Sequence, residues 1–223
     1  VLFRTCIREV EHWLQPAGAW PTWVLSNHDN VRQRSRYQGS ERAARAAAVL
    51  LLTLRGTPFI YQGEELGLVD AHIADEARID PGGRDGCRAP IPWLAEPPHD
   101  WNGASPWLPF PPDADELAAE RQVGAANSMF ALYQRLLAVR EASPALLHGD
   151  FEELPSHPEV LAYRRQLGDD LRLVCINFAE AAHACPQSGD WTVEIASDGL
   201  GEGEPYAGTL NPGQALVLRP TEA

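Results

Sequence analysis

The stretch TWVLSNHDNVR, residues 22–32, decides the fold class of this chain. Its first four residues form a short apolar run that follows Pro21 and leads into the polar residues 26–29. A run of this length between turn residues is typical of a strand that is covered on both faces, as in a parallel sheet. We therefore expect a buried strand with polar side chains at its carboxyl end.

Helices and a second strand are predicted on either side of this stretch. Residues 2–14 have helical periodicity, which ends at QPAG, residues 15–18. Ser40 is a good N-cap for a helix that ends one residue before Gly56. The run PFIY, residues 58–61, then predicts a second buried strand. Helix, strand, helix and strand in succession indicate an α/β array.

The remainder of the chain changes character twice. Residues 70–115 are rich in proline and tryptophan and have little periodicity, which is typical of a long functional loop. A helix is predicted at about residues 128–142. From about residue 149 the pattern is that of short antiparallel strands, predicted at 160–163, 171–176, 191–195 and 215–218. We expect two domains, an α/β part over residues 1–148 and an antiparallel β domain over 149–223.

The charge of the chain restricts its partners. It has 223 residues, 18 basic and 31 acidic, and a formal net charge of −13; all the basic residues are arginines. A surface this acidic repels polyphosphates, so nucleic acid and anionic membranes are poor partners and neutral substrates fit better. No apolar stretch approaches the roughly 20 residues that span a bilayer.

The cysteines show no metal-binding pattern. There are four, without CxxC spacing or nearby histidine pairs, so neither a zinc site nor a dense disulfide framework is predicted, and no cofactor motif is visible. Cys175 and Cys185 can either bridge or remain buried thiols, and the second alternative is favoured. The chain begins with Val1 inside a helical pattern, so we expect further sequence, and any targeting signal, before it.

Polar residues follow both predicted strands. The first strand is followed by Asn27, His28 and Asp29, and the second by Gln62, Glu64 and Glu65. In a β/α barrel the active site gathers at the carboxyl ends of the strands. Arg32 and Arg34 can keep Asp29 ionised by favouring its charged form. These residues alone indicate a charged cleft; the simpler interpretation is an Asn-Asp turn that leaves a strand.

Three motifs resemble a known family. LSNHDNVR (25–32), LLTLRGTPFIYQGEELG (51–67) and GRDGCRAPIPW (83–93) resemble conserved segments of the α-amylase family, glycoside hydrolase family 13. The resemblance covers the whole chain, more loosely over the tail. It implies the C-terminal portion of a (β/α)8 TIM barrel, from about the sixth to the eighth helix, followed by a small antiparallel all-β C-terminal domain.

The resemblance also implies roles for individual residues. Asp29 would be the catalytic carboxylate that binds sugar hydroxyls and stabilises the transition state, and His28 would hydrogen-bond the same glucose. Arg32 would position Asp29 or that glucose. Arg88 would line the site of the leaving sugar, with a structural arginine braced on Asp85 as the alternative.

Other residues of these motifs are expected to be structural. Glu64 and Glu65 resemble structural residues of the loop after the eighth strand. The loop tryptophans, Trp93, Trp101 and Trp107, are expected to pack the loop onto the barrel rather than to stack on sugar rings.

The implied activity is retaining hydrolysis of α-glucosidic bonds in small oligosaccharides or sucrose. The nucleophile and the general acid of the family come from its fourth and fifth barrel strands, which this chain lacks, so we expect the chain alone to be inactive. The alternatives are a transglycosylase of the same family and a catalytically dead relative that acts as a sugar-binding or transporter-associated subunit. We expect a monomer in the cytoplasm that binds a small α-glucoside and needs no cofactor.

Overall fold

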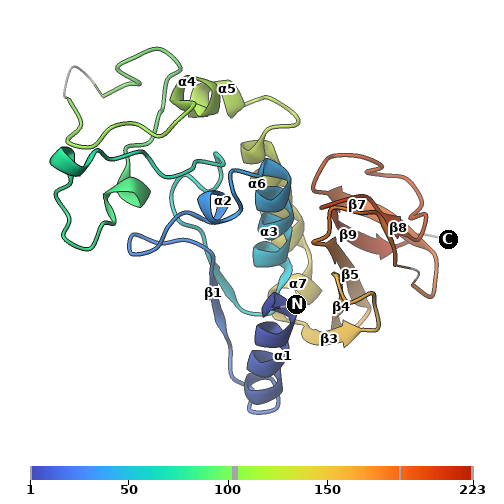
Figure 1. Cartoon of the computed structure of the whole chain (residues 1–223). Coiled ribbons are helices and arrows are strands. Elements are labelled where there is room, and N and C mark those ends of the chain that lie inside the picture. Colours follow the sequence, from blue (N-terminus) through green and yellow to red (C-terminus); the bar gives the residue numbers. More distant parts are fainter. Residues whose placement is uncertain (1, 102–104, 186, 222–223) are drawn as a thin grey trace. The chain divides into compact units, whose positions relative to one another are not determined.

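The computed structural model describes residues 2–101, 105–185 and 187–221; Val1, where the helical pattern begins, lies outside them. Figure 1 shows the order of the elements along the chain. The helices are α1 (Leu2–Leu14), α2 (Gln33–Arg36), α3 (Glu41–Thr53), α4 (Ala114–Leu117), α5 (Ala119–Gln122), α6 (Met129–Ala142) and α7 (Pro144–His148), with short 3-10 turns at Asp75–Ala77 and Asp85–Arg88. None of the described helices is both long enough and apolar enough to cross a membrane.

The strands form three sheets in the described part of the chain. β1 (Thr22–Val24) pairs with β2 (Thr57–Phe59), and β6 (His183–Ala184) pairs with β8 (Thr209–Leu210). The largest sheet has the order β3-β4-β5-β9-β7, with bounds Asp150–Leu154, Val160–Leu167, Asp170–Asn177, Ala215–Pro220 and Trp191–Ala196. All its neighbouring strands are antiparallel, which confirms the predicted antiparallel sheet.

Two compact units can be separated in the chain. The first comprises residues 1–23, 45–58 and 135–223, and the second comprises residues 24–44 and 59–134. The predicted division after residue 148 stays a prediction. We describe each unit by itself.

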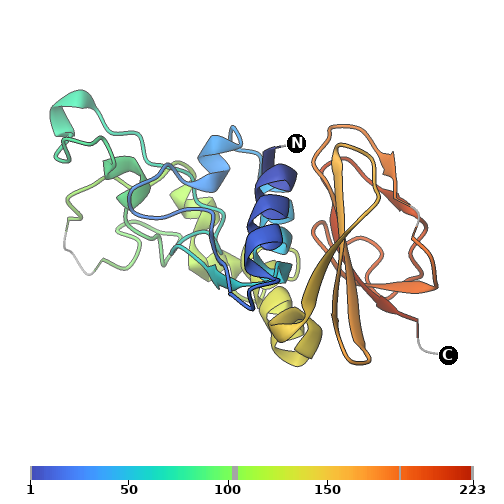
Figure 2. The same cartoon turned by 90° about the horizontal axis from the view of Figure 1, so that it is seen from below.

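In the first unit, α1 lies along the first strand of the large sheet (Figure 2). Gln15 exchanges two hydrogen bonds with Phe151: its Nε2 donates to the Phe151 carbonyl (3.2 Å), and the Phe151 N–H donates to its Oε1 (2.8 Å). The guanidinium groups of Arg4 and Arg8 both pair with the Glu153 carboxylate on the same strand. The helix is thereby tied to the sheet by polar as well as apolar contacts.

The sheet buries apolar side chains on both faces of its central strands. On one face they form a continuous core with residues of β6 to β9, made of Val160, Ala162, Leu173, Cys175, Cys185, Val193, Ala196, Leu210, Leu216 and Leu218. On the other face of β4, the hydroxyl of Tyr163 contacts that of Thr53, and Arg165 donates to the Thr53 carbonyl (2.6 Å). The hairpin between β4 and β5 pairs Leu167 with Asp170 across the two-residue turn Gly168-Asp169, a length typical of β-hairpins.

Arginine side chains satisfy the last carbonyls of α3, since a helix leaves these without partners inside the helix. Arg140, which is buried, donates to the carbonyls of Leu52 and Gly56, each at 2.8 Å. The predicted N-cap is confirmed at the other end, where the Ser40 hydroxyl accepts from the Ala43 N–H (3.2 Å).

The predicted burial of β1 and β2 on both faces is wrong for this chain. Val24, Phe59 and Ile60 are 49 %, 57 % and 37 % exposed. The reason is that the two strands pair with each other, and no further strand joins their sheet among the described residues. The first residues of the two strands lie side by side, because the Thr57 N–H donates to the Pro21 carbonyl (2.9 Å).

Gly56 makes this close approach possible, and its replacement is expected to be costly. It has φ +132°, and an added Cβ would lie 2.6 Å from the Pro21 carbonyl oxygen and 2.9 Å from the Trp23 ring. Gly56→Ala should lower the free energy of unfolding by about 2–3 kcal/mol, because it adds overlap to backbone strain. Gly18→Ala is the matched control: Gly18 has φ +64° but open space around it, and about 1–2 kcal/mol is expected. Equal losses in urea denaturation would contradict this explanation.

Candidate active site

The residues that follow β1 form a tight turn in the second unit. The Asn27 side-chain oxygen accepts from the Asp29 N–H and from the Asn30 amide, each at 2.9 Å. This is the local side chain to backbone bonding for which asparagine is favoured in turns. The turn leaves the Asp29 side chain 47 % exposed, so the carboxylate is open to a ligand. The interpretation as an Asn-Asp turn is therefore correct, and the turn also presents an accessible acid.

Three basic side chains surround the Asp29 carboxylate. His28 Nε2 lies 3.2 Å from Oδ2. Arg84 Nη1 donates to Oδ1 at 2.7 Å, and Arg88 Nη2 contacts the same oxygen at 3.4 Å. Charge-assisted hydrogen bonds of this kind are short and strong, and they hold a carboxylate in place.

Arg84 is itself fixed by a second carboxylate. Asp80 accepts from Nε (2.8 Å) and Nη2 (2.6 Å) of Arg84 and from its backbone N–H (2.9 Å). The hydrogen bonds from Arg84 hold the pKa of Asp80 well below its usual range, and those to Asp80 and then Asp29 raise the pKa of Arg84. Arg84 thus joins the carboxylates of Asp80 and Asp29, and its guanidinium has little freedom to turn away from Asp29.

Arg88 lies against the turn rather than against Asp85. Its Nε donates to the His28 carbonyl at 2.8 Å, and its Nη1 lies 3.7 Å from Asp80 Oδ1. The Asp85 carboxylate instead accepts the backbone N–H groups of Ile79 (2.7 Å) and Asp80 (3.0 Å). The alternative of a structural arginine braced on Asp85 is therefore corrected: Arg88 contacts Asp29 and the backbone of His28.

The carboxyl end of β2 also lies beside the turn that carries Asp29. The Tyr61 hydroxyl donates to the Cys87 carbonyl (3.1 Å), and the Cys87 thiol contacts the His28 carbonyl (3.5 Å). The carboxyl ends of both strands and residues 80–88 of the long loop therefore meet around Asp29. Sequence reasoning predicted this meeting of the strand ends.

Arg32 does not contact Asp29 through its side chain as expected, but packs against residues at the end of β2. Its side chain is buried, its N–H donates to Asp70 Oδ1 (2.9 Å), and its Nη1 donates to the Gln62 carbonyl (2.8 Å). Its guanidinium lies 4.9 Å from the centre of the Tyr61 ring, and burial lowers its pKa. Arg34 donates to backbone carbonyls, including that of Gly67 at 2.7 Å.

The expectation that Arg32 and Arg34 keep Asp29 ionised is therefore corrected. In the described residues, the arginines that contact the Asp29 carboxylate are Arg84 and Arg88. Sequence reasoning missed Arg84 and Asp80, although Arg84 belongs to the quoted GRDG segment. Asp80 and Arg84 are four residues apart, a spacing that allows a local ion pair and could have indicated this contact.

Glu64 is buried, and its carboxylate contacts the backbone rather than the site. It accepts the Tyr61 N–H at 3.3 Å, and Glu65 accepts the Gly63 N–H at 2.8 Å. Burial raises the pKa of Glu64 to about 7, against weaker opposing effects of hydrogen bonds from Ser26 and Tyr61 and of the charge of Arg32. These contacts favour the structural interpretation of both glutamates.

The raised pKa predicts a pH effect on stability. Glu64 binds its proton more tightly in the folded chain than in the unfolded chain, where its pKa is near 4.5. The protonated Glu64 therefore adds to the free energy of unfolding in full below about pH 4.5, and this stabilisation is lost as the pH rises to about 7. Glu64→Gln mimics the protonated form, so at pH 8 it should be more stable than the parent by about 3 kcal/mol, with no gain at pH 4. Urea denaturation at both pH values tests this, with the exposed Glu76→Gln as control; a gain that is the same at both pH values would refute it.

The loop tryptophans divide into two groups. Trp101 packs edge-on against Phe110, with ring centres 6.5 Å apart, and donates to the Ile91 carbonyl at 3.1 Å. Trp93 and Trp107 are 49 % and 62 % exposed. Packing of the loop therefore accounts for Trp101 but not for the other two.

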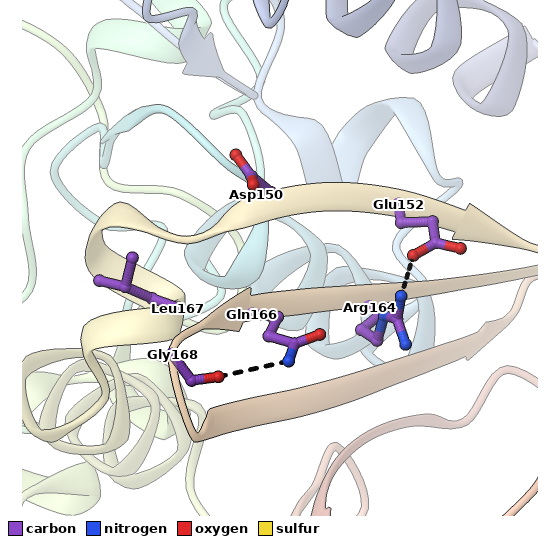
Figure 3. A pocket seen from close by; sticks show the side chains of 6 residues that line it. All are labelled: Asp150, Glu152, Arg164, Gln166, Leu167 and Gly168. Carbon is purple, nitrogen blue, oxygen red and sulfur yellow. Dashed lines mark hydrogen bonds and ion pairs between the residues drawn. The ribbon is translucent and has the colours of Figure 1, made fainter.

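A large hollow in the first unit carries no comparable chemistry. It has a volume of about 440 Å³ and lies along the β3–β4 hairpin, where Figure 3 shows its lining. Three of its lining residues are charged: Arg164 pairs with Glu152, while Asp150 has no interaction with the other residues drawn, and the Gln166 amide donates to the Gly168 carbonyl (3.3 Å). Because this hollow does not hold an accessible carboxylate among several basic side chains, the turn around Asp29 is the better candidate for an active site.

Comparisons with known proteins identify the family of the chain. The family model described as "Alpha amylase, catalytic domain" matches residues 2–149. A probable α-glucosidase of Rhizobium meliloti is 36 % identical over 184 residues, which cover 77 % of this chain and 33 % of that protein. An oligo-1,6-glucosidase of Halalkalibacterium halodurans is 30 % identical over 74 % of this chain and 35 % of its own length.

Solved structures give the same result. The trehalulose synthase of Pseudomonas mesoacidophila superposes with a TM-score of 0.85 and 28 % identity, covering 97 % of this chain and 46 % of that enzyme. The chain thus spans about a third to a half of the length of the relatives that it matches.

Proposed function

Because the chain belongs to the α-amylase family, glycoside hydrolase family 13, we propose that it supplies one side of the active site of a retaining hydrolase. The substrates would be α-glucosidic bonds of small oligosaccharides or sucrose. The observation that carries the proposal is Asp29, a half-exposed carboxylate held between His28, Arg84 and Arg88. We also propose that the enzyme is a monomer and acts in the cytoplasm on sugars that the cell has taken up.

The geometry around Asp29 suits stabilisation of a glycosyl transition state. Cleavage of a glycosidic bond develops positive charge on the sugar ring, and hydrogen bonds to its hydroxyls strengthen as that charge forms. Asp29 would accept hydroxyl hydrogen bonds and place its negative charge beside the ring. His28, whose side chain is 68 % exposed, would donate to the same sugar. Arg84 and Arg88 would hold Asp29 so that little reorganisation is needed.

The fold supports a barrel that is completed by other sequence. Val24, Phe59 and Ile60 are apolar strand residues that remain exposed. Two strands cannot close a barrel, and a complete one has about 250 residues. We infer that residues 1–148 form the C-terminal portion of a (β/α)8 barrel in a longer protein, of which this chain spans a part.

The catalytic pair would then lie outside this chain. A retaining enzyme needs a nucleophilic carboxylate and an acid about 5–5.5 Å apart. We assign neither role to a residue described above, since Asp29 is held by basic groups and Asp80 by Arg84. The chain alone is therefore proposed to be inactive.

A transglycosylase is the second candidate, because the superposed trehalulose synthase belongs among the similar structures. A catalytically dead sugar-binding or transporter-associated subunit is a weaker alternative. A dead site has no need for an exposed carboxylate held by two arginines.

The first experiment is to determine the coding sequence upstream of the chain. An open frame of roughly 300 further residues, with an aspartate and a glutamate at the ends of two further barrel strands, would support the proposal. The completed protein would then be assayed with maltose, isomaltose and sucrose, beside the 223-residue chain alone. A closed frame, replaced carboxylates or turnover by the short chain alone would each overturn a part of the proposal.

A further inference from the structure

Three potential metal ligands lie close together in the first unit, two in the turn between β3 and β4 and one on β6. His157, Glu159 and His183 each place one ligand atom within 4.8 Å of the others. His157 and His183 are 26 positions apart in the chain, so they do not form a closely spaced pair of ligands in the sequence. No part of the proposed glycosidase chemistry uses this cluster.

The backbone holds the three residues in place. His157 and Glu159 lie in the turn between β3 and β4, which is closed by a hydrogen bond from the Val160 N–H to the His157 carbonyl (2.9 Å). The Phe178 N–H donates to the Glu159 carbonyl (3.1 Å) and fixes the turn to the end of β5. His183 lies on β6, where it pairs with Leu210 of β8. The cluster is therefore built on hydrogen-bonded backbone.

The side chains already have part of a tetrahedral arrangement. Zinc bonds of about 2.0–2.2 Å to nitrogen and oxygen put neighbouring ligand atoms about 3.3–3.6 Å apart in a tetrahedron. His183 Nε2 and Glu159 Oε2 are 3.4 Å apart. The rings of His157 and His183 stack, with centres 4.0 Å apart and planes at 20° to each other. One ligand atom of His157 lies within 4.8 Å of these two atoms, so a third ligand is close by.

The polar atoms of the cluster are incompletely satisfied. His183 Nε2 is buried and has no hydrogen-bond partner among the described residues; its contact with Glu159 has an ion-pair distance without hydrogen-bond geometry. A buried polar atom without a partner is unfavourable and calls for a ligand. The Glu159 side chain is 56 % exposed, which leaves a path for an ion and for a water molecule.

The neighbouring Arg4 does not block the site. Arg4 donates to the His157 carbonyl (3.3 Å), but its guanidinium also pairs with the Glu153 carboxylate. The His157 ring makes one weak competing contact, because its Nδ1 accepts the Glu159 N–H at 3.3 Å. Metal binding through Nδ1 of His157 would break only this long hydrogen bond, and binding through Nε2 would keep it.

We propose that His157, Glu159 and His183 bind a divalent transition metal ion, with Zn²⁺ as the best fit. Two imidazoles and one carboxylate suit zinc and its neighbours, whereas calcium and magnesium prefer oxygen ligands alone. The site has three protein ligands and one position open to water.

Calorimetric titration of the 223-residue chain with ZnCl₂ tests the site. Cys6→Ser serves as the reference chain, because the Cys6 thiol is exposed and can bind zinc itself. We expect one equivalent of Zn²⁺ to bind, with Kd at least about tenfold higher in His157→Ala and in Glu159→Gln, since even loss of a supporting group costs about 10- to 100-fold. Both residues are exposed, so these variants should fold.

The control is His72→Ala, an exposed histidine outside the cluster, which should bind zinc as the reference does. A zinc-dependent rise in Tm that is present in the reference and lost in His157→Ala gives a second readout. Absence of saturable binding, or equal affinity in the reference and both ligand variants, would overturn the proposal. Either result is independent of glycosidase activity, so it leaves the proposed function untouched.

Discussion

Asp29→Asn, made in the enzyme that this chain is proposed to complete, is expected to lower kcat/KM for α-glucosides by about 10³-fold, or about 4 kcal/mol of transition-state stabilisation. The substitution keeps the shape of the side chain and removes its charge. The charge is what would oppose the positive charge of the sugar ring, and the amide also puts an N–H in contact with His28 and Arg84. The loss should fall mainly on kcat, because the charge on the sugar develops in the transition state.

Asp75→Asn is the matched control for this measurement. Asp75 is also paired with an arginine, Arg78, at 2.8 Å, but its side chain is 85 % exposed and it makes no contact with the turn around Asp29 among the described hydrogen bonds. Its substitution should leave kcat/KM within about twofold. If Asp29→Asn kept activity within tenfold of the parent, Asp29 would not have the proposed role.

The position of the site could be predicted because it depends on local signals. Proline and asparagine bound the first strand, and the Asn27 side chain builds the turn that presents Asp29. Ser40 caps α3 as expected, and Gly168-Asp169 forms the hairpin turn between β4 and β5. Each of these features is decided by residues within a few positions of one another, so the sequence contains the whole cause.

The partners of Asp29 could not be predicted in the same way. Arg84 lies 55 positions from Asp29, in a loop with no periodicity to fix its path. Arg32, three positions from Asp29, was the natural choice by proximity, yet its side chain is buried against Gln62 and Tyr61. Which arginine reaches the carboxylate depends on how the long loop folds back, and the composition of that loop does not specify this.

The exposure of β1 and β2 has a different cause. The apolar pattern of Val24, Phe59 and Ile60 matches strands covered on both faces, while among the described residues β1 and β2 pair only with each other. An apolar pattern reflects the burial that a segment has in its stable surroundings, and the described residues do not provide that burial. The mismatch is therefore consistent with the proposed barrel.

A buried ion pair between α1 and the segment after α3 was also not anticipated. Glu11 Oε2 accepts from Arg55 Nε at 2.7 Å, and the two side chains are only 6 % and 5 % exposed. Arg55 also donates to the Ala19 carbonyl (2.9 Å) and lies 5.2 Å from the centre of the Trp20 ring. Burial raises the pKa of Glu11 even beside Arg55, so the cost of desolvation exceeds the attraction of the pair.

This imbalance predicts opposite results for single and double substitutions. Glu11→Leu leaves the Arg55 charge buried without its partner and should lower the free energy of unfolding by about 3–5 kcal/mol. Adding Arg55→Met removes that charge and should recover most of the loss, because well-packed apolar residues often replace a buried pair without cost. Urea denaturation of the parent, both single variants and the double variant gives the coupling energy directly. Additive losses would mean that the two charges act independently and that the pair, despite its 2.7 Å contact, does not stabilise the junction of α1 with residue 55.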